Sequence, residues 1–159
     1  MIAILADIRS SHNTGSLFRT ADAAGVEKLY LAGVTSGPKD RYGRPNEKLL
    51  KVALGAEKAV AWEHIRSAAR LVDILKKDGF DIWALEQARS ATSLFDARPK
   101  NFSKLALVVG NEIKGLSRAL LKRADRVVYV PMYGKKESLN VAVAFGIAVY
   151  QFRATIGKL

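Results

Sequence analysis

The sequence predicts an α/β protein built around a parallel sheet. Short apolar runs bounded by turn residues recur along the chain, and segments with helical periodicity lie between them. The runs do not alternate strictly between apolar and polar residues, which is typical of strands covered on both faces. The chain has 159 residues, 49% of them hydrophobic, and this is close to the usual size of one domain. We therefore expect residues 1–159 to form a single domain.

Six strands are expected, with a helix after the first. The strands are Ile2–Ala6, Leu29–Ala32, Ala59–Trp62, Ile82–Leu85, Leu105–Val109 and Val127–Val130. Asn13 is a candidate N-cap of the first helix, Gly15 would allow close approach to the helix start, and Gly25 suits the C-terminal cap. The apolar stripe of this helix consists of Leu17, Phe18, Ala21 and Ala24. Arg19 lies about 200° from Leu17 and is therefore off the stripe.

Two later helices have distinct patterns. From Ile65 to Leu75 apolar residues recur at helical spacing, and Gly79 is placed to end that helix. The last helix, Leu139 to about Arg153, is apolar on all sides. A helix of this kind must be buried all round, so we expect a second copy of the chain to cover part of it; the alternative is a central helix within one chain. Residues 33–46 and 90–103 are expected to be the least structured.

The composition excludes several classes of chemistry. The chain has no cysteine and only two histidines, His12 and His64, which are not spaced like metal ligands. Disulfides, thiolate metal sites and cysteine nucleophiles are therefore excluded, and we expect no metal other than magnesium at most. The sequence contains neither a run of about 18 apolar residues nor a secretory signal pattern. We expect a cytoplasmic protein without a membrane segment.

The charge indicates a polyanion as partner. Lys and Arg number 26 against 15 Asp and Glu, a formal net charge of +11. Basic residues gather in two segments, Lys39 to Lys51 and Lys114 to Lys136. This distribution favours binding to nucleic acid over a merely solvated basic surface.

The segment "VVGNEIKGLS" (residues 108–117) lies where an expected strand meets a helix. Its Gly110 and Gly115 nearly reproduce the spacing of a phosphate-binding P-loop, but Leu116 stands where that motif has Lys. No G-x-G-x-x-G motif occurs either, which weakens a dinucleotide interpretation. Ser117 is best explained as the cap of the next helix.

The segment "VPMYGKKESLNVAVAFG" (residues 130–146) combines a loop with the start of the apolar helix. Ser138 is a candidate N-cap, and Asn140 is expected one turn inside the helix, where its amide needs a partner. A polar residue at such a place indicates a binding site. Backbone groups between Met132 and Leu139 could bond a purine edge, with Val130 and Leu139 covering its faces.

Together with "SHNTGSLFRTADAAG" (residues 11–25), these segments resemble, in order, the three signature motifs of the SpoU/TrmH family of RNA ribose 2′-O-methyltransferases, of the SPOUT class. The first motif is matched by Asn13, Gly15, Arg19 and Ala21. The second is matched by Gly110, Asn111, Glu112, Gly115, Leu116 and Ser117. The third is matched by Met132, Gly134, Ser138, Leu139, Asn140 and Val141.

The resemblance implies a C-terminal trefoil knot, a homodimer with active sites at its interface, and S-adenosylmethionine as cofactor. The cofactor residues that it implies are Val109, Gly110, Asn111, Gly115, Val130, Met132, Ser138 and Leu139. It implies Arg19 as the catalytic residue, with Asn13, Glu112, Ser138 and Asn140 arranging the site. Because a guanidinium stays protonated in proteins, we expect Arg19 to bind the neighbouring phosphate and lower the pKa of the ribose hydroxyl. The alternatives are direct proton acceptance and, from the residues alone, a surface ion pair with Asp22.

The substrate is the least defined part of this interpretation. Longer relatives carry an extra N-terminal RNA-binding domain, which we do not expect in this chain. We therefore expect RNA to bind the basic surface of the core. The expected contacts are Lys39, Arg41, Arg44, Lys114, Arg118, Lys135 and Lys136. Transfer RNA is favoured over ribosomal RNA, and DNA is not expected. The alternatives are a non-catalytic RNA-binding or ribosome-assembly protein with the same fold and, less favoured because of Leu116, a nucleotide hydrolase.

Overall fold

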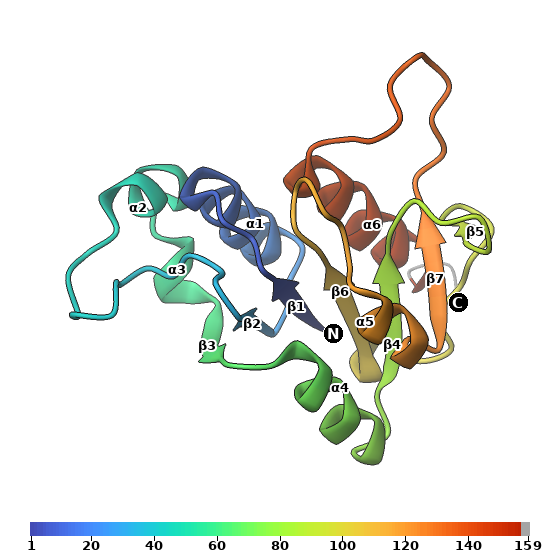
Figure 1. The fold of residues 1–159 in the computed structure, drawn as a ribbon, viewed down its shortest axis with the longest axis horizontal. Coiled ribbons are helices and arrows are strands. Elements are labelled where there is room, and N and C mark those ends of the chain that lie inside the picture. The colour runs from blue at the N-terminus through green and yellow to red at the C-terminus, as the bar shows by residue number, and fades with distance from the viewer. Residues whose placement is uncertain (157–159) are drawn as a thin grey trace.

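A parallel sheet lies between two layers of helices in the computed structural model, which describes residues 1–156 (Figure 1). The strand order is β3-β2-β1-β6-β4-β7-β5, and every pair of neighbours is parallel. The strands are β1 (Ile2–Ala6), β2 (Lys28–Ala32), β3 (Ala61–Ile65), β4 (Asp81–Leu85), β5 (Thr92–Ser93), β6 (Leu105–Val109) and β7 (Arg126–Tyr129). The predicted α/β class is confirmed. The knot stays a prediction.

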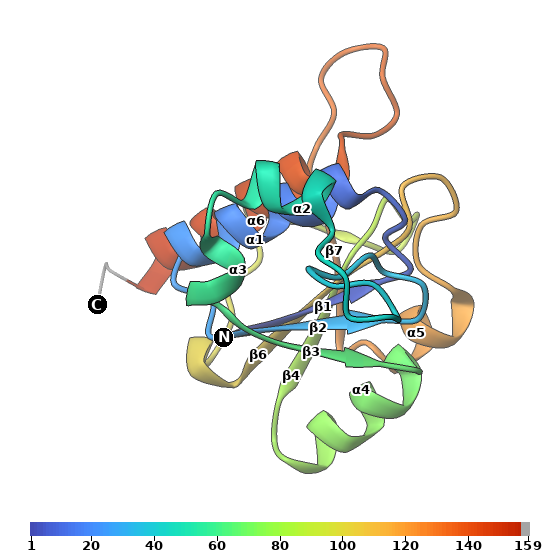
Figure 2. The same cartoon turned by 90° about the vertical axis from the view of Figure 1, so that its left-hand side faces the viewer.

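Helices cover both faces of the sheet, as Figure 2 shows. One face carries α1 (Ser11–Ala23), α2 (Glu47–Ala53), α3 (Ala56–Ala59) and α6 (Val141–Ile156), and the other carries α4 (Ala68–Lys77) and α5 (Arg118–Arg123). Successive side chains of a strand point to opposite faces. In β1, Leu5 accordingly joins the core under α1 and α6, while Ile4 joins the core under α4 and α5.

The strands β1 and β6 form the point where the connections change sides. The two strands pair directly, with Ile2 opposite Ala106. The helix that follows β1 lies on one face of the sheet, whereas the helix that follows β6 lies on the other. At such a point the two connections diverge and leave a crevice beyond the carboxyl ends of the strands, which is where open α/β sheets bind ligands.

Several predictions for the middle of the chain differ from the structure. The strand expected at Ala59 starts at Ala61, because residues 56–59 form the short helix α3 after Gly55, whose φ is +94°. Ile65, expected to begin a helix, ends β3 instead, and Ser67 caps α4. The 90–103 segment, expected to be among the least structured, contains no regular element longer than the two-residue strand β5 and the start of a 3-10 helix, Phe102–Lys104.

The start of α1 also differs from the prediction. Ser10, not Asn13, is its N-cap, and the Ser10 hydroxyl accepts a hydrogen bond from the Asn13 amide. Asn13 therefore lies in the first turn, where its side chain is available for other partners. Gly25 has a φ of +66° just after the helix, as its expected capping role requires. The predicted stripe that includes Leu17 and Phe18 is buried, as expected.

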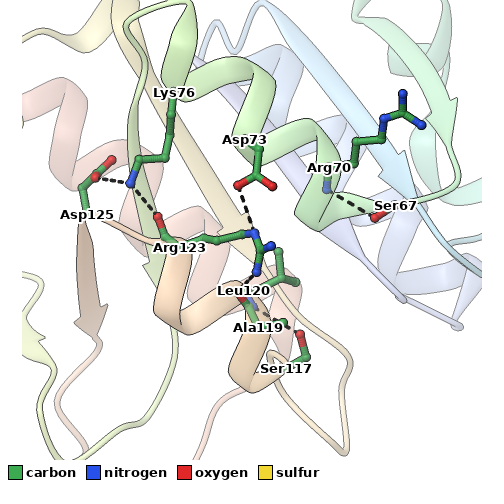
Figure 3. Close-up of polar contacts among 9 residues, drawn as sticks. All are labelled: Ser67, Arg70, Asp73, Lys76, Ser117, Ala119, Leu120, Arg123 and Asp125. Carbon is green, nitrogen blue, oxygen red and sulfur yellow. Dashed lines mark hydrogen bonds and ion pairs between the residues drawn. The ribbon is translucent and has the colours of Figure 1, made fainter.

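Polar contacts join α4 to α5 and to the start of β7 (Figure 3). Arg123 Nε lies 3.0 Å from Asp73 Oδ1, and Lys76 Nζ lies 2.6 Å from Asp125 Oδ1. Ser117 caps α5 by accepting a hydrogen bond from the Leu120 amide, which confirms its predicted role. Arg123, which belongs to the basic segment 114–136, is therefore paired with an acidic residue, Asp73.

The last helix is only partly covered within one chain. Phe145, Val149 and Phe152 are buried, but Val143 and Tyr150 are 51% and 52% exposed. The expectation of a helix buried all round is therefore not met by the single chain. None of the helices within residues 1–156 has the length and hydropathy that a membrane span requires.

Gly15 brings two helices together. It lies inside α1, not at the start of the helix as expected, and a Cβ atom there would sit 2.6 Å from the carbonyl oxygen of Leu49 and 2.9 Å from Cβ of Val52. The sequence of α1 thus permits α2 to pack closely against it. The close approach that the sequence predicted at Gly15 is therefore one of packing between two helices.

The variant Gly15→Ala is expected to lose stability, because the new methyl group meets backbone that a rotamer change cannot move. The expected loss is about 1–3 kcal/mol in the free energy of unfolding, measured by urea titration. Gly146→Ala is the matched control, since its Cβ would lie at an ordinary 3.6 Å from Thr20. Equal unfolding midpoints for Gly15→Ala and the wild type would contradict this assignment.

Candidate active site

A pocket lies at the carboxyl ends of β4, β6 and β7 and extends to the start of α6. All the residues that the sequence analysis assigned to the cofactor line it: Val109, Gly110, Asn111, Gly115, Val130, Met132, Ser138 and Leu139. Further lining residues were not predicted; they are Leu85, Glu86, Gln87, Ile113, Tyr129, Val141 and Ala144. The fold thus brings three separate segments of the chain, within residues 85–87, 109–115 and 129–144, to one cavity.

The turn from Gly110 to Gly115 forms one wall of this pocket. The Asn111 side-chain oxygen accepts hydrogen bonds from the amides of Ile113 (3.0 Å) and Lys114 (2.9 Å), and its Nδ2 donates to the carbonyl of Asp7 (2.8 Å). Asn111 therefore shapes the turn and ties it to the end of β1. A Cβ on Gly110 would lie 2.7–2.9 Å from the backbone of Gly115 and Leu116, so glycine is required for the turn to close.

Glu86, which directly follows β4, supports the same turn. Its Oε2 accepts a hydrogen bond from the Leu116 amide at 2.7 Å, and a Cβ on Gly115 would collide with this carboxylate. Gly115 also has a φ of +65°, which favours glycine. Glu86 was not predicted, although a polar residue just after an apolar strand, at the carboxyl edge of a parallel sheet, indicates a site residue.

A second group of polar residues lies at the crevice between β1 and β6. Asn140 Nδ2 donates to Asn13 Oδ1 at 3.0 Å, and Asn13 Nδ2 donates to Glu112 Oε1 at 3.0 Å. The Glu112 carboxylate also accepts hydrogen bonds from the amides of Ser10 (3.2 Å) and Arg9 (3.4 Å). The fold thus joins residues from all three signature segments into one chain of hydrogen bonds.

Asn140 was expected one turn inside the last helix, with Ser138 as a candidate cap. In the structure α6 begins at Val141, so Asn140 precedes the helix and its Oδ1 accepts a hydrogen bond from the Ala142 amide at 2.8 Å. Ser138 is therefore not a cap. It lies on the exposed loop and lines the pocket instead.

The environment of Glu112 keeps it ionised. Burial acts to raise the pKa of the Glu112 carboxylate, but hydrogen bonds from the Asn13 side chain and from backbone amides, including those of Ser10 and Arg9, hold the pKa below its ordinary value of 4.5. The negative charge is thereby fixed next to the two asparagines. A charged acceptor of this kind orients the Asn13 amide so that its oxygen faces Asn140.

The variant Glu112→Gln is expected to change how the stability of the fold depends on pH in the acid range. Because the folded-state pKa is lowered, the ionised carboxylate stabilises the fold above pH 4.5, and this contribution is lost as the pH falls through the folded-state value. The melting temperature of Glu112→Gln should therefore lie below that of the wild type near neutral pH and converge with it in acid. Thermal melts over a pH series measure this, and a difference independent of pH would contradict it.

Arg19 stands apart from these groups within one chain. It is exposed on α1, six residues and therefore about 9 Å of helix beyond Asn13, and it does not line the pocket. Residues 1–156 contain no ion pair between Arg19 and Asp22, the alternative that the sequence left open. Its catalytic role stays a prediction.

The predicted RNA contacts are spread around this end of the molecule. Lys114 lines a hollow with Arg9, Asn13 and Glu112, directly beside the polar group. Lys135 and Lys136 lie on the exposed loop between β7 and α6, which projects at the top of Figure 1, and Arg118 begins α5. The remaining three, Lys39, Arg41 and Arg44, lie on the loop between β2 and α2. Within residues 1–156 no three acidic or histidine side chains form a metal-binding group.

Comparison with known proteins decides the family. Residues 1–150 match the SpoU rRNA Methylase family. The chain belongs to this family. The expectation that the three motifs raised is thereby confirmed, and the pocket and the polar group described above consist of residues from this matched region.

Relatives in this family act on different RNAs. A 23S rRNA (guanosine-2′-O-)-methyltransferase, RlmB of Escherichia coli (strain K12), is 34% identical over 94% of this chain and 58% of its own length. The chain thus spans less than two thirds of the length of the curated relatives that it matches. The A. aeolicus TrmH/SpoU tRNA modifying enzyme is 29% identical, with a TM-score of 0.85 over 99% of this chain and 75% of its own. A structure from work on the 2-OH methylation of C/U34 on tRNA is also 29% identical, with a TM-score of 0.81 over 98% of this chain and 96% of that one.

Proposed function

We propose that this protein transfers a methyl group from S-adenosylmethionine to a ribose 2′-hydroxyl of RNA. The observation that carries the proposal is the position of the pocket directly beside the hydrogen-bonded group of Asn13, Glu112 and Asn140. Family membership supports methyl transfer, and the crevice between β1 and β6 is where this type of sheet binds ligands.

The pocket suits S-adenosylmethionine in shape and chemistry. Val109, Val130 and Leu139 supply apolar walls for an adenine ring, while the glycine turn exposes backbone groups along one side. Gly110 and Gly115 have no side chains that would fill this space; a Cβ on Gly110 would collide with the backbone of the turn, and a Cβ on Gly115 would collide with the Glu86 carboxylate. When bound, the cofactor supplies a methyl group on a sulfonium, which needs no metal or cysteine.

The polar group is suited to hold the ribose. The amide of Asn13 is held between Glu112 and Asn140, so its orientation is set before a substrate binds. Alignment of this kind can lower the activation barrier of a reaction between two substrates by about 7–11 kcal/mol. In the proposed reaction Arg19 binds the phosphate next to the ribose and lowers the pKa of the hydroxyl that loses its proton.

The proposal includes a homodimer in which Arg19 of one chain serves the site of the other. Arg19 lies outside the pocket of its own chain, and α6 exposes Val143 and Tyr150 although it is apolar. A second copy packed on this surface would cover the apolar side chains and bring a guanidinium to the site. The oligomeric state in solution, measured by light scattering, checks this part of the proposal.

Transfer RNA is the proposed substrate, in the cytoplasm. Two solved structures similar to this chain belong to work on tRNA, whereas the curated relative acts on 23S rRNA. The test is incubation with labelled S-adenosylmethionine and, separately, tRNA and ribosomal RNA, followed by mapping of 2′-O-methyl groups. Label in tRNA is the expected result, and label in ribosomal RNA alone would replace the substrate. RNA binding without label would favour a non-catalytic RNA-binding protein.

A further inference from the structure

The loop between β2 and α2 presents an aromatic ring among positive charges. Tyr42 is 66% exposed at its tip. The guanidinium carbons of Arg41 and Arg44 lie 4.7 and 5.1 Å from the centre of the Tyr42 ring. An exposed aromatic ring next to arginines is the arrangement with which proteins stack unpaired nucleobases.

The tip of this loop is held in one conformation. Asp40 Oδ1 accepts hydrogen bonds from the amides of Tyr42 (2.8 Å) and Arg44 (2.9 Å), and Asp40 Oδ2 pairs with Arg44 Nε at 2.7 Å. Gly43 has a φ of +78°, which lets the chain reverse direction, and Lys39 pairs with Pro45 across the loop. The ring of Tyr42 is therefore presented by an ordered turn, which lowers the entropy lost when a ligand binds.

Both ends of the loop are tied to residues 9–11, the segment next to the polar group of the candidate active site. Ser36 Oγ donates to the Arg9 carbonyl at 2.9 Å, and Asn46 Nδ2 donates to Ser11 Oγ at 3.0 Å. The same short segment contributes the Arg9 amide that bonds Glu112. The loop also follows the carboxyl end of a parallel strand and so lies at the edge of the sheet that carries the site (Figure 2).

The two arginines differ in how firmly they are held. Arg44 is paired with Asp40, whereas Arg41 forms no ion pair within residues 1–156. Arg41 can therefore leave the ring and contact a phosphate without breaking another interaction. The surrounding charge suits RNA, because Lys39, Lys48 and Lys51 are exposed on the same loop and helix.

We propose that Tyr42 is a stacking platform for an unpaired base of the RNA substrate, and that Arg41 moves to a flanking phosphate when the base stacks. The proposal deepens the proposed function, on which it rests, by assigning single-stranded RNA as the form that this loop recognises. Stacking on an aromatic ring tolerates every base, so the platform selects an unpaired segment and leaves the choice of nucleotide to the active site.

The test compares two single strands that carry the same charge. One is oligoadenylate, and the other is an abasic ribose-phosphate oligomer of the same length. Loss of one stacked base lowers affinity by about 5- to 150-fold. Tyr42→Ala is therefore expected to weaken oligoadenylate binding by this factor, to leave abasic binding unchanged, and to keep the salt dependence of the wild type. Tyr42→Phe should bind like the wild type.

Two further variants separate stacking from charge and from loss of any exposed aromatic residue. Lys39→Ala should weaken both oligomers and lower the slope of affinity against salt concentration by about one. Phe95→Ala removes an exposed aromatic side chain next to β5, at the opposite edge of the sheet, and should leave both affinities unchanged.

The proposal is overturned if Tyr42→Ala binds oligoadenylate as tightly as the wild type, or if it weakens both oligomers equally. These binding measurements contain no methyl donor, so they can fail while methyl transfer by the wild type is intact. Conversely, an inactive wild type whose oligoadenylate affinity depends on Tyr42 would refute the methyltransferase proposal and leave the stacking platform in place.

Discussion

Arg19→Ala is expected to lower the rate of RNA methylation by about 100- to 1,000-fold, which is the usual effect of removing one group that stabilises charge in a transition state. The ribose oxygen gains negative charge as its proton leaves, and a guanidinium next to it lowers the pKa of the hydroxyl. Arg19 does not line the pocket, so the affinity for S-adenosylmethionine should not change. Single-turnover methylation and calorimetry with the cofactor measure the two effects separately.

Arg70→Ala is the matched control for this variant. It removes the same charge from an exposed position on α4, on the opposite face of the sheet from α1. Its methylation rate should equal that of the wild type. Normal turnover by Arg19→Ala would remove the residue from the mechanism, and a loss of cofactor affinity in that variant would show a structural role instead.

Mixing Arg19→Ala with a second inactive variant extends the test to the dimer. If Arg19 of one chain serves the pocket of the other, an Arg19→Ala chain still has an intact pocket for a partner. Combined with Asn13→Ala chains that keep Arg19, it should regain part of the activity that either variant lacks alone. A mixture as inactive as its components would contradict a shared site.

Gly110→Ala is expected to abolish most of the affinity for S-adenosylmethionine. The added Cβ would lie 2.7 Å from the Gly115 carbonyl carbon and 2.8 Å from the Leu116 nitrogen, and these are backbone atoms that no rotamer change can move. The turn must therefore open and displace the wall of the pocket. Strain of about 1–3 kcal/mol that is relieved only in an open turn corresponds to a loss of about 5- to 150-fold in affinity.

Titration calorimetry with the cofactor measures this loss, and Gly146→Ala is the control because its Cβ would meet only Thr20 at 3.6 Å. The affinity of Gly110→Ala for oligoadenylate should be unchanged, since the platform on the β2–α2 loop does not include the turn. That result also shows that the variant is folded. Unchanged cofactor affinity in Gly110→Ala would mean that the pocket lies elsewhere.

The strands and the pocket residues could be predicted because their signals are local. The runs Ile2–Ala6 and Leu105–Val109 coincide with β1 and β6, since an apolar run between turn residues is sufficient to specify a covered strand. The turn after β6 was indicated by its two glycines, Gly110 and Gly115, and the loop before α6 by Asn140, a polar residue at the start of an apolar helix. Even so, the family motifs, and not the spacing, supplied the roles of these residues.

Helix starts were predicted less well because several polar residues compete for each cap. Ser10 and Asn13 are both good N-caps, and the structure shows that the helix begins at Ser11 with Ser10 as its cap. Gly15 is a similar case, because its role depends on α2, more than 30 residues further along the chain. For Glu86 the sequence offers a signal of position, directly after β4, but its bond to Leu116, 30 residues away, appears only in the tertiary structure.

By itself, the sequence determined the fold class and most of the strands, and its motifs indicated the family and eight of the residues that line the pocket. These properties follow from the types of neighbouring residues, which fix local conformation and burial. Only the tertiary structure decided that β6 lies beside β1, and this joins Glu112 to Asn13 across 99 residues and Asn13 to Asn140 across 127. The order of strands depends on many contacts between residues far apart in the sequence, in both cores. It therefore cannot be predicted from the residue types of a short segment.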